Sequence, residues 1–382
     1  MLENYKDQME CCALCHDQCV SACPMFAVER KTTVYPSRKS QIARCIMIGD
    51  VDFDEESAEL FYHCCGCRQC KENCVHSKDP KDPPAVFREV RRRAIEAGIK
   101  PGFVKDAEGM LEKYGNFYGD AGQRQKEAFP VPGSMEPEKT LYFVDAETLF
   151  LNPEAASAAF EIMKRRGVNV QASSVTESGY DMYSLGFEQK GKAAAAEAAA
   201  YIAVQNATRV VVSNPKEYYA LTAWYSELGL DLNTEVVLET SFLYDILIVS
   251  PKEVSKRFAE VMHFLRMKET ATYHDGSYMA RYIGEFDKPR QILRPMFRRF
   301  VDMYPCRERA KPVAPADFPL GVSEKTLEGI AAWRIADLES AGVDLVVTSD
   351  PLSNAAFKKY WHADRVLSIP EALLKNYVEK IR

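Results

Sequence analysis

The 382-residue chain lacks several features that define common classes of protein. Lys and Arg total 49 against 55 Asp and Glu, a net charge of -6, so there is no basic field to recruit nucleic acid. No apolar run approaches the ~18 residues that span a bilayer. The chain also contains no G-x-G-x-x-G turn, no phosphate-binding loop and no G-x-S-x-G elbow. These absences argue against a nucleic-acid-binding protein, a membrane-spanning protein and the common nucleotide-dependent enzymes.

Glycine and proline are also sparse, at 19 and 20 residues, which excludes collagen-like and low-complexity chains. The composition, 47% hydrophobic and 27% charged, is that of a folded soluble protein, and its length suggests two or three domains. The first residues have no apolar core of the kind a secretory signal needs. We therefore expect a cytoplasmic protein, in which clustered cysteines bind metal more often than they form disulfides.

Cysteine is almost absent from most of the chain, because eleven of the twelve cysteines lie between Cys11 and Cys74. They include two regularly spaced runs. The first has the pattern C-x2-C-x3-C-x3-C-P and consists of Cys12, Cys15, Cys19 and Cys23. The second has the pattern C-x2-C-x2-C-x3-C and consists of Cys64, Cys67, Cys70 and Cys74. The second spacing is that of bacterial ferredoxins, in which the fourth cysteine binds the other of two clusters.

This spacing predicts two [4Fe-4S] clusters with crossed ligands. Three thiolates on one tight loop reach three irons of a cubane, and the fourth cysteine points away to a second cubane. We therefore assign one cluster to Cys12, Cys15, Cys19 and Cys74. The other is assigned to Cys64, Cys67, Cys70 and Cys23.

Other interpretations of the cysteine-rich segment are possible. Two four-cysteine zinc sites would fit poorly, because structural zinc usually takes paired knuckles far apart. Three cysteines of this segment are left over. We interpret Cys11 and Cys65 as packing residues beside the ligands, and Cys45 as a buried small hydrophobe. Solvent shielding or partner docking is the expected role of His16, His63 and His76. A predicted helix from near Pro84 carries Arg88 and Arg91 to Arg93, either as a solvated face or as a docking patch for an acidic partner.

Residues 12 to about 101 resemble a known family. The segments 35–44, 59–67 (ELFYHCCGC) and 87–91 (FREVR) look like the iron–sulfur electron-transfer proteins typified by the D subunit of heterodisulfide reductase. The iron–sulfur component of glycolate oxidase and the C subunit of anaerobic glycerol-3-phosphate dehydrogenase are similar. The resemblance implies an N-terminal helical, ferredoxin-like domain with two [4Fe-4S] clusters.

The resemblance continues more weakly through the C-terminal part. Family members carry there two copies of a module with a lone Cys, then Cys-Cys-Gly, then Cys-Pro-x-Cys. This chain keeps the surrounding pattern with other residues at those places, namely Ala146, Glu177-Ser178-Gly179, Asn214, Glu217, Ser277, Asp350 and Ser353. Such residues cannot replace soft thiolates, so we expect that these lobes have lost cluster binding. Asp145, Glu147, Asn214, Glu217, Ser277 and Asp350 would form a polar pocket or serve as turn and cap residues. Cys306 has no vicinal partner, and we interpret it as structural.

An internal repeat supports two related lobes. Residues 209–215 (RVVVSNP) parallel 344–351 (DLVVTSDP), and 237–247 parallel 366–374, each beginning with an apolar strand. Strands alternate with helices such as 153–166 and 191–205, which favours parallel sheets. The predicted fold is α+β, with a two-cluster domain at 1–100, a linker at 101–138 and α/β lobes at 139–255 and 256–382.

The predicted function is that of a non-catalytic electron-transfer component of an oxidoreductase complex. It would relay single electrons between a flavoprotein (FAD or FMN) or an electron-transfer flavoprotein and a further acceptor, such as the quinone pool through a membrane-associated protein. The chain would then lie peripherally at the inner face of the membrane. Two alternatives remain: a catalytic heterodisulfide or thiol reductase, and a non-redox scaffold whose clusters only hold the domain together.

Overall fold

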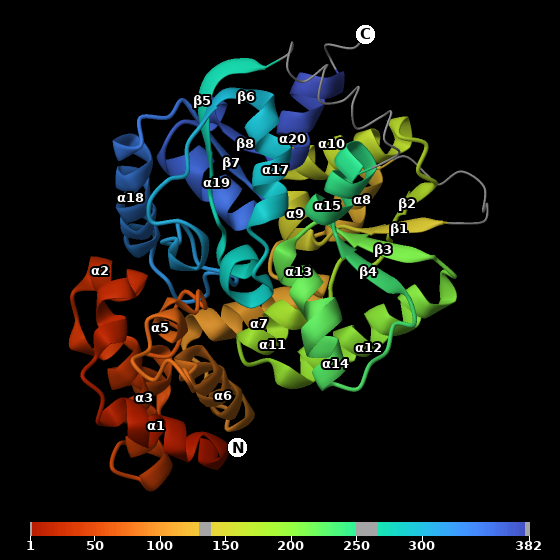
Figure 1. The fold of residues 1–382 in the computed structure, drawn as a ribbon. Helices are drawn as coiled ribbons and strands as arrows, with labels where there is room; N and C mark the ends of the chain where they lie inside the picture. Colours follow the sequence, from red (N-terminus) through yellow and green to blue (C-terminus); the bar gives the residue numbers. More distant parts are fainter. Residues whose placement is uncertain (1, 130–138, 250–265, 379–382) are drawn as a thin grey trace. The chain divides into compact units, whose positions relative to one another are not determined.

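The structure is a computed structural model that describes residues 2–129, 139–249 and 266–378 (Figure 1). Packing divides the chain into two compact units. Unit 1 consists of Met1–Phe117, Gly179–Ala193 and Lys311–Arg334, and unit 2 of Tyr118–Ser178, Ala194–Ala310 and Ile335–Arg382. The segments Gly179–Ala193 and Lys311–Arg334 therefore belong to the same unit as the cysteine-rich residues, although they are distant from them in sequence. The predicted boundaries between domains stay a prediction, although the described part of the predicted linker 101–138 forms helices.

The described residues of unit 1 form helices and no strand. These are η1 (Leu2–Tyr5), α1 (Lys6–Ala13), η2 (Gln18–Ala22), α2 (Pro24–Glu29), η3 (Thr32–Val34), α3 (Pro36–Ile48), α4 (Glu55–Glu59), α5 (Gln69–Glu72), α6 (Pro83–Glu96), α7 (Gly102–Tyr114) and α11 (Tyr180–Ser184). The helices α12 (Glu188–Val204) and α18 (Glu324–Ser340) contribute residues to both units.

Proline marks several helix starts in unit 1, since α2, α3 and α6 each begin at a proline. A proline at the first position sacrifices no helical hydrogen bond and presets the backbone angle. The apolar face predicted for α6 is buried at Val86, Phe87 and Val90. These three side chains form one core with Leu2 and Phe61. The core fixes α1, α3 and α6 around the two cysteine loops.

Unit 2 contains two parallel four-stranded sheets. Their strands are β1 (Thr140–Phe143), β2 (Val170–Ala172), β3 (Arg209–Val212), β4 (Glu235–Leu238), β5 (Met267–Tyr273), β6 (Phe297–Phe300), β7 (Leu345–Thr348) and β8 (Val366–Ser368). The orders are β2-β1-β3-β4 and β6-β5-β7-β8, the same topology twice. The predicted α+β class, parallel sheets and internal repeat are thereby confirmed.

Helices join the strands of unit 2, as a parallel sheet requires. They are α8 (Ala121–Ala128), α9 (Ala146–Leu151), α10 (Pro153–Arg165), α13 (Pro215–Tyr219), η4 (Ala220–Trp224), α14 (Tyr225–Glu227), α15 (Glu239–Tyr244), η5 (Asp245–Val249), η6 (Met279–Ile283), α17 (Asp287–Met296), η7 (Arg307–Arg309), α19 (Pro351–Tyr360), η8 (Ala363–Arg365), α20 (Ile369–Leu373) and η9 (Leu374–Val378). The helices predicted at 153–166 and 191–205 correspond to α10 and α12.

The two lobes pack against each other in matched pairs of helices. Helix α9 packs on α19 and α13 on η6, while α10 packs on α20 and α15 on α17. In each of these two sets, the second pair consists of the elements that are equivalent, in the other repeat, to those of the first pair. This is the pattern of a two-fold interface. One hydrophobic core runs through both sheets and includes Tyr142, Val211, Tyr273 and Val347. The lobes therefore fold as one body rather than as independent domains.

Candidate iron–sulfur site

The first cysteine run wraps around a tight loop. Helix α1 ends at Ala13, and the left-handed backbone of Asp17 (φ 61°) turns the chain into η2. Arg38 donates to the Asp17 carboxylate at 2.8 Å and holds this turn. Cys23 is extended and immediately precedes Pro24 at the start of α2. The fourth cysteine therefore leaves the loop at the beginning of a helix, as the spacing predicts.

The second run makes a similar loop with two residues in the left-handed region. Gly66 has φ +62° and Arg68 has φ 55°, and α5 begins directly after Arg68. The positive φ favours glycine at position 66, and a Cβ there would also meet the carboxylate of Asp317. Arg68 pairs with Asp82 at 3.0 Å. These contacts give the loop its shape independently of any bound group.

The loops together enclose two hollows. The first hollow is lined by Cys11, Cys12, Cys15, Cys19, Cys70 and Cys74, among other residues. The second hollow is lined by Cys23, Cys64, Cys65, Cys67 and Cys70, also among other residues. Each hollow thus collects three cysteines of one run and the last cysteine of the other run. Cys70 lines both hollows, so the two lie next to each other.

The thiols of these hollows are largely buried. Burial raises the pKa of Cys12 to about 12, and those of Cys19 and Cys23 to about 11. Burial likewise raises the pKa of Cys70 well above its ordinary value. At Cys23 the ammonium of Lys39 acts in the opposite direction. Without a bound cation such thiols stay protonated at neutral pH, so they do not act as free nucleophiles.

The residues around the hollows suit iron–sulfur clusters. Soft thiolates are the ligands that such clusters require, and none of the cysteines forms a disulfide. The backbone N–H of Gly66 points at Cys64 Sγ and that of Lys81 at Cys74 Sγ, each at 3.4 Å. Donors of this kind tune cluster potentials. Among the described residues no three His, Cys, Asp or Glu side chains are placed to hold a single metal ion. The cysteine assignment itself remains a prediction.

The left-over cysteines occupy different surroundings. Cys11 Sγ lies 3.1 Å from Nε2 of His76, at the rim of the first hollow. Cys65 is 2% exposed, and its carbonyl accepts a hydrogen bond from Ala316 N. Cys45 and Cys306 are half-buried, so Cys45 is less enclosed than expected. Of the remaining histidines, His16 is exposed, whereas His63 lies 3.5 Å from the Glu29 carboxylate.

Three of the four arginines of α6 make contacts within unit 1. Arg91 is 5% exposed and donates to the carbonyls of Phe61 and Ser184. Arg88 lies over the Tyr183 ring at 4.4 Å, and Arg92 pairs with Glu89 at 2.7 Å. They tie α6 to the 179–193 segment of unit 1. Sequence reasoning missed this role because the partners are about 90 residues away.

In the first lobe of unit 2, a buried polar network replaces cysteine. Asn214 donates to the carboxylates of Asp145 and Glu147, both at 2.9 Å. Lys216 pairs with Glu147 at 2.6 Å, and the Tyr118 hydroxyl donates to the same carboxylate at 2.8 Å. Asp145 and Asn214 also cap α9 and α13. The expected cap role is therefore present at Asp145 and Asn214, which join Glu147 in a hydrogen-bonded cluster, while Lys216 was missed.

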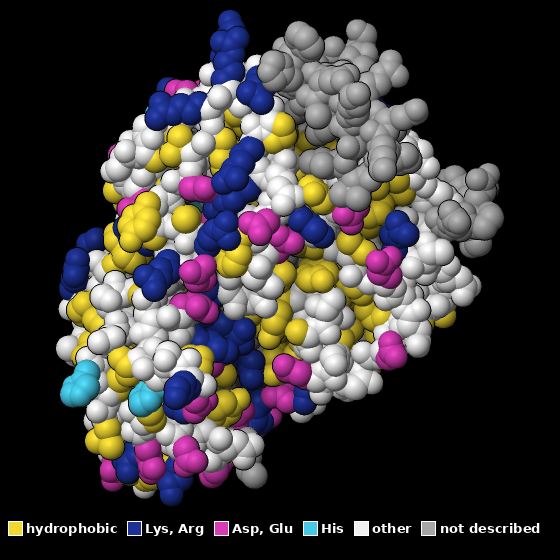
Figure 2. Space-filling model, in the orientation of Figure 1, with side chains coloured by type: hydrophobic (Ala, Val, Ile, Leu, Met, Phe, Trp, Pro, Cys, Tyr) yellow, Lys and Arg dark blue, Asp and Glu magenta, His cyan; other side chains and the backbone are white. Residues whose placement is uncertain are grey.

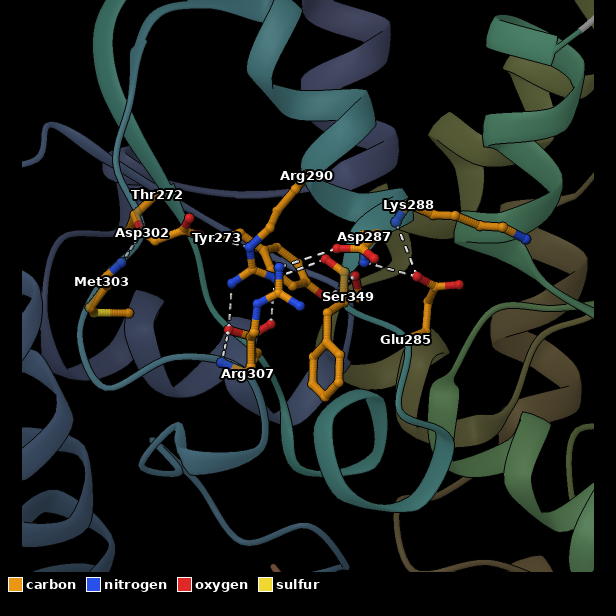
Figure 3. A network of polar contacts seen from close by, with 12 residues as sticks. Thr272, Tyr273, Glu285, Asp287, Lys288, Arg290, Asp302, Met303, Arg307 and Ser349 are labelled. Carbon is orange, nitrogen blue, oxygen red and sulfur yellow. Dashed lines mark hydrogen bonds and ion pairs between the residues drawn. The ribbon is translucent and has the colours of Figure 1, made fainter.

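In the second lobe the corresponding groups are arranged differently. Asp350 caps α19, and its carboxylate leaves no room for a side chain at Gly276. The Ser277 hydroxyl accepts a hydrogen bond from the Arg281 guanidinium at 2.9 Å. A separate network, absent from the sequence predictions, joins Arg290 to Asp275 by two 2.8 Å bonds and to Asp302 at 2.6 Å (Figure 3). These ion pairs hold the loops after β5 and β6 together.

The surface over the first hollow is partly apolar. Leu14, beside Cys15, is 87% exposed, and Val75, beside Cys74, is 41% exposed. Figure 2 shows histidine side chains at the surface near the N-terminal helices, with hydrophobic side chains among them. Four of the five cysteines that line the second hollow are buried, against three of the six that line the first. The first hollow is thus the one nearer to solvent.

No helix in the described ranges combines the length and apolarity needed to cross a membrane.

Comparison with known protein-family models finds no match. The chain is 24% identical to a probable membrane-anchored ferredoxin of Chromohalobacter salexigens over 261 residues, which cover 64% of this chain but only 37% of that protein.

A second relative matches over nearly the whole chain. It is the D subunit of the dihydromethanophenazine:CoB–CoM heterodisulfide reductase of Methanosarcina acetivorans, 22% identical over 377 residues, which cover 90% of this chain and 87% of the relative. Both relatives are iron–sulfur electron-transfer proteins. The predicted resemblance is thereby confirmed: at low identity and over most of its length, this chain is similar to iron–sulfur electron-transfer proteins, the D subunit of heterodisulfide reductase among them.

Proposed function

We propose that the chain is an electron-transfer protein that carries two [4Fe-4S] clusters, one in each hollow. Cys12, Cys15, Cys19 and Cys74 would bind the first, and Cys23, Cys64, Cys67 and Cys70 the second. The observation that supports this proposal is the composition of the hollows: each combines three cysteines of one run with the last of the other. When bound, each cluster would take up and release single electrons.

The chain's own residues would position these clusters and set their surroundings. Cys70 lines both hollows, which keeps the two sites adjacent for electron exchange. The exposed side chains of Leu14 and Val75 make the first hollow the side on which a redox partner would dock. We propose a flavoprotein as that partner and a quinone-reducing membrane protein as a further one, which would place the chain at the inner face of the membrane. Anaerobic affinity purification with mass spectrometry tests this, and recovery of neither class would contradict it.

Crossed ligation gives a sharp test in the anaerobically reconstituted full chain. Wild-type protein should hold about eight irons, two clusters of four. Cys23→Ser, in the first run, should damage the cluster held by the second run, and Cys74→Ser the cluster held by the first. The loss is read as iron content and as the disappearance of one of two electron paramagnetic resonance (EPR) signals.

Cys45→Ala is the matched control, because Cys45 lies in the same helical unit and lines neither hollow. It should leave both signals unchanged. Fewer than about four irons per wild-type chain would contradict the proposal. Loss of the same signal in both serine variants would contradict the crossed assignment alone.

A disulfide-reducing enzyme is the less favoured function. Two of the positions that hold cysteine in the resembling family are here Asn214 and Glu217, and Asn214 donates hydrogen bonds to the carboxylates of Asp145 and Glu147. These oxygen and nitrogen groups do not exchange with a disulfide. Turnover of a heterodisulfide by the isolated, cluster-loaded chain would reverse this preference.

A further inference from the structure

A buried lysine lines the second hollow without a carboxylate partner. Lys39, on α3, is 1% exposed and lies beside Cys23, Cys64, Cys67 and Cys70. Its ammonium donates to the carbonyl of His63 and lies 4.6 Å from the centre of the Phe87 ring. No carboxylate of the described residues is within ion-pair distance of it.

Such an arrangement is costly for the protein alone. A lysine ammonium has three N–H donors, and a carbonyl satisfies only one of them. A cation in a low-dielectric interior is destabilising unless a counter-charge lies close to it. The aromatic face of Phe87 contributes ~2 kcal/mol or more to such a desolvated cation, against a cost of several kcal/mol for burying an ion. A compensating anion is therefore expected in the adjacent hollow.

The other cations that line the two hollows each have a carboxylate partner. Arg68, which also lines the second hollow, pairs with Asp82 at 3.0 Å. Lys81, at the first hollow, pairs with Asp79. Lys39 is thus distinguished from them by having no carboxylate partner among the described residues.

We propose that Lys39 is the counter-cation of the second cluster and raises its reduction potential. This inference rests on the proposed function, since it requires a cluster bound by Cys23, Cys64, Cys67 and Cys70. Four thiolates on a cubane carry net negative charge, which supplies the missing anion. Reduction adds one electron and no proton, so the more negative form gains more from a fixed positive charge nearby. The effect is strong because both groups are shielded from water.

The test is an anaerobic redox titration of the cluster-loaded full chain, followed by EPR. In Lys39→Met the equilibrium constant for one-electron reduction of the second cluster should fall at least tenfold, a shift of ~59 mV. Lys39→Gln keeps a donor for the His63 carbonyl and should lower this equilibrium constant by the same factor. Lys39→Arg keeps the positive charge and should have the wild-type equilibrium constant. The signal lost in Cys23→Ser identifies the second cluster.

Lys100→Met is the control, because Lys100 lies in the same helical unit, lines neither hollow and pairs with Glu108 at 2.7 Å. It should change neither equilibrium constant by more than about twofold. A second readout is the free energy of unfolding of the chain without clusters. The Lys39→Met variant should then be no less stable than wild type, because the substitution removes an uncompensated charge.

The outcomes separate the two proposals. If wild-type protein holds two clusters and Lys39→Met and Lys39→Gln leave both potentials unchanged, the role of Lys39 is refuted and the proposed function stands. If wild-type protein binds fewer than about four irons, the proposed function itself fails.

Discussion

The buried ion pair between Lys216 and Glu147 allows a quantitative test of how unit 2 is held together. The two side chains are 1% and 3% exposed and 2.6 Å apart. Lys216→Met would leave the carboxylate buried without its cation, a change that costs ~3–5 kcal/mol in comparable pairs. Two donors, Tyr118 and Asn214, remain on Glu147. We therefore expect the lower end of the range, ~3 kcal/mol.

Thermal unfolding of the full chain, followed by circular dichroism, measures this loss. For a unit of this size ~3 kcal/mol corresponds to a midpoint roughly 6–12 °C lower. A double variant, Lys216→Met with Glu147→Gln, removes the unpaired charge and should regain at least half of the loss. Arg165→Met is the control, because Arg165 pairs with Glu161 at the surface and its loss should cost at most ~1 kcal/mol.

Two results would refute this reasoning. One is a Lys216→Met variant as stable as wild type, and the other is a double variant no more stable than the single one. In either case the pair would not be stabilised by charge. The iron content of Lys216→Met should equal that of wild type, since the eight proposed ligands all lie in unit 1. Loss of iron would argue that unit 2 takes part in binding the metal.

Two further predictions concern unit 1. Burial raises the thiol pKa values of Cys12, Cys19 and Cys23 further above neutrality, so cluster assembly must release protons. Iron retention against a chelator should therefore improve as pH rises from about 6 to 8, and a pH-independent retention would count against this reasoning. A Cβ at Gly186 (φ +100°) would lie 2.7 Å from the backbone of Arg91, so Gly186→Ala should lower the free energy of unfolding by ~2–5 kcal/mol, measured by thermal unfolding. Gly98 also has a positive φ but has open space around it, so the control Gly98→Ala should cost only ~1 kcal/mol, and equal losses would show that the close approach is unimportant.

Features that depend on neighbouring residues were predictable from the sequence. The spacing of the cysteines indicates two loops, and the prolines at 24, 36 and 83 mark where helices begin. The repeated strand and turn at 209–215 and 344–351 indicated two related lobes, and the sheets do share one topology. Each of these signals acts within a few residues, through backbone angles or through alternation of apolar side chains.

Other features depend on chain segments that are far apart in sequence. The 179–193 and 311–334 segments belong to unit 1, although their sequences look like parts of the lobes. Asp317 lies against Gly66, and Arg91 is buried because Ser184 accepts its hydrogen bond. No local pattern in the sequence identifies such partners.

The sequence by itself determined which residues have the chemistry for iron–sulfur binding, because ligand type and loop spacing are local properties. Only the tertiary structure decided that Cys70 lies between two hollows and that Lys39 is buried beside one of them without a carboxylate. It also decided that Lys216 and Glu147 occupy the first lobe's polar centre. The physical reason is that burial and charge compensation depend on everything packed around a group, and packing brings together residues that the sequence keeps far apart.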